Sequence, residues 1–165
     1  TSCVLARHTY DTLMGCMEKA CEDIAAHRVT KDVETVAFIN IALTGVISGI
    51  ARGLGQSAIG HEFYYALRKH FTNEAISYLH GEIVAVGLLM QIYYNQTPEL
   101  VDVFRTFMKK LGMPTNVKEL GLEPSEEVYE TIYEYIMERA RTVSPYVRED
   151  DESINRFREG LCLLF

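Results

Sequence analysis

The sequence predicts an all-α protein, an irregular bundle of about seven helices. Apolar residues recur three or four positions apart over most of the 165-residue chain, as they do on one face of a helix. Residues that start helices (Thr, Ser and Pro) and residues that stop them (Gly and Pro) separate these periodic segments. The alternating pattern of a strand and the dipeptides of a tight hairpin are not found. A chain of this length is expected to form one domain, over residues 1–165.

The first two helices are expected in the N-terminal third of the chain. One should run over residues 4–27, with Ile24 on its apolar face. The next should begin at Thr30, whose hydroxyl can cap free amides at a helix start. Its interior, residues 36–50, is apolar on every face, which predicts a central helix surrounded by others.

The same stretch holds the longest apolar run and three regularly spaced glycines. The run, residues 37–51, is short of the roughly twenty residues that span a bilayer, so no membrane is expected as a partner. Gly45, Gly49 and Gly53 are spaced every four residues, which lets a neighbouring backbone approach closely. The apolar run favours a buried helix, whereas each glycine costs about 1 kcal/mol of helix propensity and is also compatible with a break in the helix.

Five further helices are expected along the rest of the chain. Thr97 followed by Pro98 is a typical helix start, and so is Ser125 after a proline. Gly112 and Pro114 are expected to end the helix that Thr97 opens. The five are expected at residues 58–71, 80–95 and 97–111, from Ser125 onward, and at residues 152–163.

Composition and charge narrow the class of protein. Hydrophobic residues make up 48% of the chain and charged residues 24%, which is typical of a globular domain. A net charge of −7 repels a phosphate backbone and an anionic membrane, so nucleic acid is not expected as a partner. The cysteines lack CxxC spacing, and free thiols in a reducing cytoplasm are expected. They are Cys3, Cys16, Cys21 and Cys162.

Two histidines occupy the first turns of successive predicted helices. His61 follows the start of the helix at residues 58–71, and His80 opens the helix at residues 80–95. A neutral imidazole is a good ligand for zinc or iron. The two residues cannot share one helix face, so the intervening chain must fold back to bring the rings together. Two readings remain open: a pair of metal ligands, or ordinary polar residues at helix starts.

The segments around these histidines carry a resemblance to a known family. "LHGEIVAVGLLMQ" at residues 79–91 resembles the His-Gly-Glu segment of the metal-dependent polyol dehydrogenase superfamily. This superfamily includes glycerol dehydrogenase, iron-containing alcohol dehydrogenase and dehydroquinate synthase. "SAIGHEFYYAL" at residues 57–67 is similar to the preceding histidine-bearing helix. The resemblance covers nearly the whole chain, is closest to glycerol dehydrogenase-like members, and implies the fold of the dehydroquinate synthase-like C-terminal domain.

The resemblance implies a role for each histidine. His80 matches a residue that binds a divalent metal, zinc or iron. The earlier helix in the family usually bears two histidines, the first a ligand and the second close to the substrate. His61 matches the second, and the ligand position falls on Ser57 or Ala58, which are poor ligands. Either His61 coordinates the metal itself or metal is bound weakly or not at all; we therefore assign metal binding to His80 and His61, and a catalytic role to His61.

The resemblance further implies an oxidoreductase, an NAD(P)-linked alcohol or polyol dehydrogenase. The family's acidic ligand lies upstream of the first residues here, and its N-terminal nucleotide-binding domain is expected to be absent from this chain. NAD(P) would then be bound mainly by that missing domain, and the isolated chain is expected to be inactive. "GLGQSAIG" at residues 53–60 follows a helix rather than a strand, so we assign no cofactor-binding residue to it. A small alcohol or polyol substrate, a homo-oligomeric full-length form and a cytoplasmic location are expected.

Two alternatives stay open. One is a sugar-phosphate cyclase of the dehydroquinate synthase type, which needs basic residues for the phosphate. Between residues 53 and 87 the only arginine or lysine residues are Arg68 and Lys69. This small number gives the cyclase alternative little support. The other is a non-catalytic helical interaction module in which the histidines are incidental.

Overall fold

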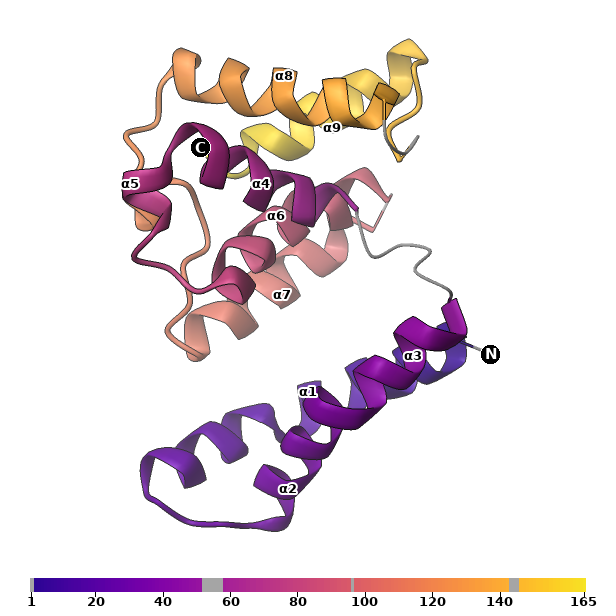
Figure 1. The fold of residues 1–165 in the computed structure, drawn as a ribbon, viewed down its shortest axis with the longest axis vertical. Helices are drawn as coiled ribbons and strands as arrows, with labels where there is room; N and C mark the ends of the chain where they lie inside the picture. Colours follow the sequence, from indigo (N-terminus) through magenta and orange to yellow (C-terminus); the bar gives the residue numbers. More distant parts are fainter. Residues whose placement is uncertain (1, 52–57, 96, 143–145) are drawn as a thin grey trace. The chain divides into compact units, whose positions relative to one another are not determined.

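The computed structural model describes residues 2–51, 58–95, 97–142 and 146–165 (Figure 1). Every regular element within those ranges is a helix, so the predicted all-α class is confirmed. The chain divides into two compact units, Thr1–Gln56 and Ser57–Phe165. The single domain expected from the chain length stays a prediction.

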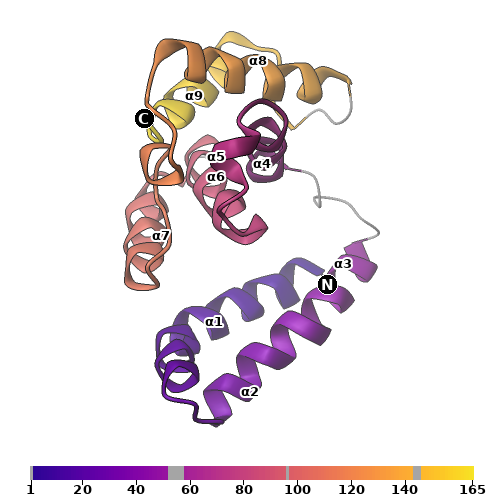
Figure 2. The ribbon, with the colours of Figure 1, turned by 60° about the vertical axis from the view of Figure 1, so that its left-hand side comes forward.

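The first unit is a hairpin of two long helices. Helix α1 (Ser2–Ala25) is followed by a second long helix made of α2 (Lys31–Phe38), a π-helical stretch (Ile39–Leu43) and α3 (Thr44–Ala51). The second helix folds back along α1, which contacts both α2 and α3 (Figure 2). In the π-helical stretch the N–H of Thr44 bonds to the carbonyl of Ile39, five residues back.

A buried carboxylate closes the turn of this hairpin. Asp23 is fully buried and accepts hydrogen bonds from Lys19, from Arg28 Nη2 at 2.5 Å and from the Thr30 hydroxyl at 2.8 Å. These hydrogen bonds lower the pKa of Asp23, and the bond from Lys19 has the largest effect. Thr30 is the N-cap of α2, as predicted, but its hydroxyl makes no capping bond. The predicted capping role is therefore wrong, because Asp23 takes that hydroxyl instead.

Within the first unit the long apolar helix packs on α1, whereas the sequence had suggested a central helix surrounded by others. Within it Phe38, Ile41 and Val46 are 61%, 83% and 51% exposed. A hairpin partner covers only one face of a helix, which is why the opposite apolar face stays exposed. A Cβ atom placed on Gly45 or Gly49 would meet nothing within 4 Å, so the predicted close approach does not occur there. Gly53 lies outside the described residues.

The length of this helix also differs from the expectation. The segment Lys31–Ala51 forms 21 residues of continuous helix with a mean hydropathy of 1.7 in its most apolar window. By length and composition alone it is able to cross a membrane, a test that core helices of globular proteins and signal sequences also pass. The sequence argument that the apolar run is too short to span a bilayer therefore does not apply to this 21-residue helix.

The second unit is a bundle around one central helix. Helix α6 contacts α4, α7 and α9, and α4 also packs against α8 (Figure 1). The α-helices of the unit are α4 (Ile59–His70), α5 (Thr72–Ala75), α6 (His80–Tyr94), α7 (Glu99–Lys110), α8 (Glu126–Thr142) and α9 (Asp151–Cys162). A short 3₁₀ turn, η2 (Lys118–Leu120), lies between α7 and α8.

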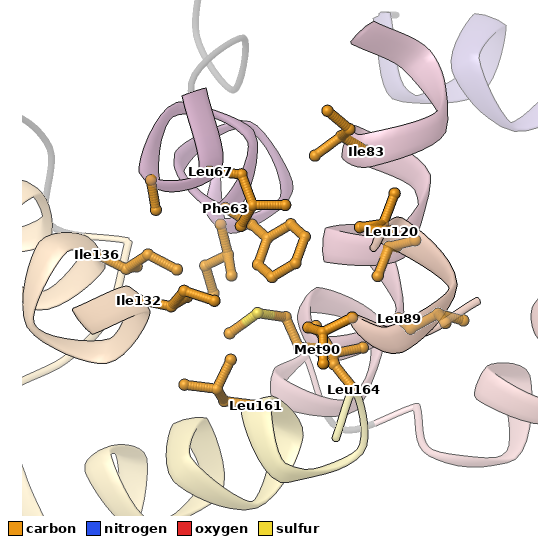
Figure 3. Close-up of a cluster of buried hydrophobic side chains, with 14 of the residues drawn as sticks. Phe63, Leu67, Ile83, Leu89, Met90, Leu120, Ile132, Ile136, Leu161 and Leu164 are labelled. Carbon is orange, nitrogen blue, oxygen red and sulfur yellow. The ribbon is translucent and has the colours of Figure 1, made fainter. Parts of the chain in front are cut away.

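The core of this unit is formed where α4, α6, α8 and α9 meet. Its side chains point at one another from helices far apart in the sequence, and they are almost fully buried (Figure 3). Burying each large apolar side chain contributes about 1.5–3 kcal/mol. The labelled members are Phe63, Leu67, Ile83, Leu89, Met90, Leu120, Ile132, Ile136, Leu161 and Leu164.

Most predicted helix starts in this unit are found within one or two residues. Ser125 accepts a hydrogen bond from the N–H of Val128 at 3.2 Å and opens α8. Asp150 caps α9 by accepting from the N–H of Ser153 at 2.8 Å. Helix α5 was not predicted, because a single turn is too short to show helical periodicity.

Candidate functional site: a histidine pair at two helix starts

The two histidines singled out in the sequence lie in the first turns of α4 and α6. Ala58 is the N-cap of α4 in an extended conformation, and its carbonyl accepts from the N–H of His61 at 2.8 Å. His80 is the first residue of α6. The carboxylate of Glu82 accepts from the N–H of Leu79 at 2.7 Å, which closes the first turn of α6. Both histidines therefore project from ordered helix starts.

A close contact between two glycines sets the spacing of α4 and α6. A Cβ atom on Gly87 would lie 2.9 Å from the Cα of Gly60 and 2.8 Å from the Cβ of Phe63. A Cβ on Gly60 would in turn lie 3.3 Å from the backbone N of Leu88. Because neither position has a side chain, the two backbones touch next to His61.

The two imidazole rings lie side by side. Their centroids are 5.5 Å apart, and the ring planes are inclined by 49°. Two imidazoles that bind one tetrahedral zinc through nitrogens about 2.0 Å from the metal have centroids about 5 Å apart. The ring of Tyr64 meets that of His80 edge-on at 4.4 Å. The arrangement is therefore compatible with two ligands to one metal ion, with Tyr64 restricting the ring of His80.

The surroundings of His61 favour the neutral form of its ring. Burial lowers the pKa of His61, and the neighbouring His80 lowers it further, while Glu62 acts in the opposite direction. His61 is half-buried and His80 is exposed. A histidine with a lowered pKa keeps a free nitrogen lone pair at neutral pH, which is the form that binds metal.

An ion pair between a buried carboxylate next to His61 and a half-buried arginine was not predicted from the sequence. Glu62 is fully buried and accepts from Arg139 Nε of α8 at 3.1 Å. The hydrogen bond to Glu62 raises the pKa of Arg139. The pKa of the neighbouring Tyr146 hydroxyl is raised mainly by burial and further by the Glu62 carboxylate. The signal in the sequence was the position of Glu62 between Ile59 and Ala66, within the apolar face of its helix.

The pair supplies two candidate ligands and not a complete set. Among the described residues, no group of three or more His, Cys, Asp or Glu side chains is placed to hold a metal ion. Ser57, one of the two positions that the resemblance assigns to a ligand, lies outside the described residues, as do residues 53–56 of the glycine-containing loop. Ala58, the other position, has a side chain without a donor atom.

Comparisons with known proteins identify the relatives of the chain. A glycerol dehydrogenase of Citrobacter freundii is 32% identical over 122 residues, which cover 72% of this chain and 31% of that protein. A glycerol dehydrogenase of Thermotoga maritima is 29% identical over 124 residues, or 74% of this chain and 32% of that protein. The chain is homologous to glycerol dehydrogenases. It spans about a third of the length of these relatives.

Other comparisons agree with this homology. A glycerol-1-phosphate dehydrogenase of Staphylothermus marinus is 33% identical over 96 residues, or 58% of the chain and 25% of that protein. The crystal structure of a probable glycerol dehydrogenase from Sinorhizobium meliloti 1021 matches with a TM-score of 0.78 and 23% identity, over 99% of this chain and 44% of that one. This likeness confirms the predicted fold. No protein-family model matches the chain.

Proposed function

We propose that this glycerol dehydrogenase homologue forms the helical metal- and substrate-binding part of an NAD(P)-linked polyol dehydrogenase. The observation that carries the proposal is the 5.5 Å separation of the His61 and His80 rings, which project from the starts of two different helices. Convergence of two imidazoles at about the spacing of two metal ligands supports a metal site, whereas the non-catalytic alternative gives this spacing no role.

The histidine pair would hold one divalent metal, zinc or iron. Imidazole nitrogen suits either ion, and two imidazoles are half of a four-coordinate zinc site. The remaining ligands would come from groups other than the described His, Cys, Asp and Glu side chains. When bound, the metal ion would polarise the substrate hydroxyl and lower its pKa.

His61 would serve the site in one of two ways. Its lowered pKa favours the neutral ring, which has a single nitrogen with a free lone pair. That nitrogen would either coordinate the metal, in place of a ligand at Ser57 or Ala58, or accept a proton on the path from the substrate hydroxyl.

The cofactor and the substrate follow from the relatives. NAD(P) would be held mainly by a nucleotide-binding domain that is not among these 165 residues, and hydride transfer would belong to that cofactor. A small uncharged polyol is favoured over a phosphorylated one, because the relatives that cover more of the chain are glycerol dehydrogenases. We also propose a cytoplasmic location, which the four free cysteines support, and a homo-oligomeric complete enzyme.

Zinc titration calorimetry tests the metal assignment. The unsubstituted chain, His80→Ala and His61→Ala are compared with His8→Ala, which removes an exposed histidine of α1 as a matched control. We expect each of the first two substitutions to weaken zinc binding at least about tenfold, since a direct ligand is lost. The control should bind as the unsubstituted chain does. Equal zinc uptake by His80→Ala and the unsubstituted chain would remove His80 from the site.

A second measurement tests the substrate class. A form of the protein that includes a nucleotide-binding domain is assayed for stoichiometric NADH release with glycerol and with glycerol 1-phosphate. Release with glycerol supports the proposal and excludes a cyclase, in which the nicotinamide is regenerated. Activity with the phosphorylated substrate alone would contradict the choice of an uncharged polyol.

A further inference from the structure

Helix α4 is capped by a side chain from another helix. Its own N-cap residue, Ala58, has no side chain that can accept a hydrogen bond. Instead, the amide oxygen of Gln91, in the last turn of α6, accepts from the backbone N–H of Gly60 at 3.0 Å. The two residues are 31 positions apart in the sequence. The cap is therefore a tertiary contact, made only when α4 and α6 are packed together.

This hydrogen bond acts on the residue next to His61. Gly60 is buried, so its N–H has no access to water as a substitute acceptor. The first N–H groups of any helix lack partners within the helix, and a first turn without a cap frays readily. Fraying of this turn would displace His61 from His80, because the contact of Gly60 with Gly87 holds the same turn against α6.

We infer that Gln91 is a positioning residue: its amide oxygen holds the first turn of α4 against α6 and so maintains the separation of the His61 and His80 rings. The consequence for metal binding rests on the proposed function. The consequence for the ring separation does not, since it concerns the metal-free protein.

The test uses two substitutions at one position. Gln91→Met keeps the length of the side chain and removes the acceptor, whereas Gln91→Glu keeps an acceptor and adds a charge that is favourable at a helix N-terminus. In each metal-free protein, NMR measures the amide exchange rate of Gly60 and the nuclear Overhauser contact between the two imidazole rings. Zinc titration of the same samples measures the metal affinity per folded molecule.

For Gln91→Met we expect the Gly60 amide to exchange about tenfold faster, as for a lost cap. The ring-to-ring contact should weaken, and the zinc dissociation constant should rise several-fold. Gln91→Glu should keep all three close to their original values. Unchanged ring contact and unchanged zinc affinity in a folded Gln91→Met protein would overturn the inference and leave Gln91 a stabilising residue only.

The same measurements separate this inference from the proposed function. If the unsubstituted protein binds no zinc, the metal assignment fails, and the inference is decided by the ring contact alone. If zinc binds and depends on both histidines while Gln91→Met leaves the rings in place, the inference fails and the proposed function stands.

Discussion

The contact between Gly60 and Gly87 makes Gly87→Ala the most informative perturbation of the bundle. The added Cβ atom would lie 2.8 Å from the Cβ of Phe63 and 2.9 Å from both the Cα and the carbonyl oxygen of Gly60. Carbon atoms pack best about 3.5–4.0 Å apart, so α4 and α6 must separate by roughly 1 Å. Two of the three atoms belong to the α4 backbone and cannot rotate away.

The expected free energy follows from two opposing effects. Overpacking of a closely packed interior costs about 1–3 kcal/mol, and contact with backbone places this substitution near the upper end. Alanine gains about 1 kcal/mol over glycine in helix propensity, so the net loss of unfolding free energy should be about 2 kcal/mol. The displaced α4 should also weaken zinc binding, since His61 moves with it.

Gly81→Ala is the matched control, because it is the same substitution in the first turn of the same helix. A Cβ on Gly81 would meet nothing within 4 Å, so the free energy of unfolding of this variant should increase by about 0.5–1 kcal/mol. Urea unfolding followed by far-ultraviolet circular dichroism measures both variants. If Gly87→Ala proves as stable as Gly81→Ala, the close contact does not determine the spacing of the two helices, and the reasoning is refuted.

Three further predictions concern the core and two titrating groups. Leu89→Ala should cost about 2–5 kcal/mol of unfolding free energy but leave zinc affinity per folded molecule unchanged; a selective loss of zinc binding would contradict this. Because the pKa of Asp23 is lowered in the fold, its contribution to stability is present above the ordinary value of 3.8 and is lost as pH falls below it. Urea midpoints across pH 3 to 6 should therefore fall less steeply in Asp23→Asn, and parallel curves would count against the buried carboxylate. Because the pKa of His61 is lowered from 6.5, stability should rise as pH increases through 6.5, an increment that His61→Gln should remove.

Features that depend on neighbouring residues were predicted well. The start of α8 at Ser125 follows from a hydroxyl that accepts a hydrogen bond from the amide three residues further on, and α9 begins one residue before its predicted start at residue 152. The histidines at the starts of α4 and α6 were located by the same kind of local signal. One-turn helix α5 left no periodic pattern, so the sequence could not indicate it.

Features that depend on distant residues were not predicted. The partner of Glu62 is Arg139, 77 positions away, and the cap of α4 comes from Gln91, 31 positions from Gly60. Close backbone approach was expected at Gly45 and occurs instead at Gly60 and Gly87. Spacing within one helix shows that a small residue is present but does not show whether another helix packs against it.

By itself, the sequence determined that this chain is helical, where most of its helices begin, and which two histidines lie at helix starts. Those properties arise from hydrogen bonds and side-chain contacts within a few residues of one another. The tertiary structure alone decided that α6 is buried while the long apolar helix of the first unit is largely exposed, and that the His61 and His80 rings lie 5.5 Å apart. The physical reason is that helical periodicity defines which face is apolar, whereas the surface that covers this face is chosen by packing between segments far apart in the chain.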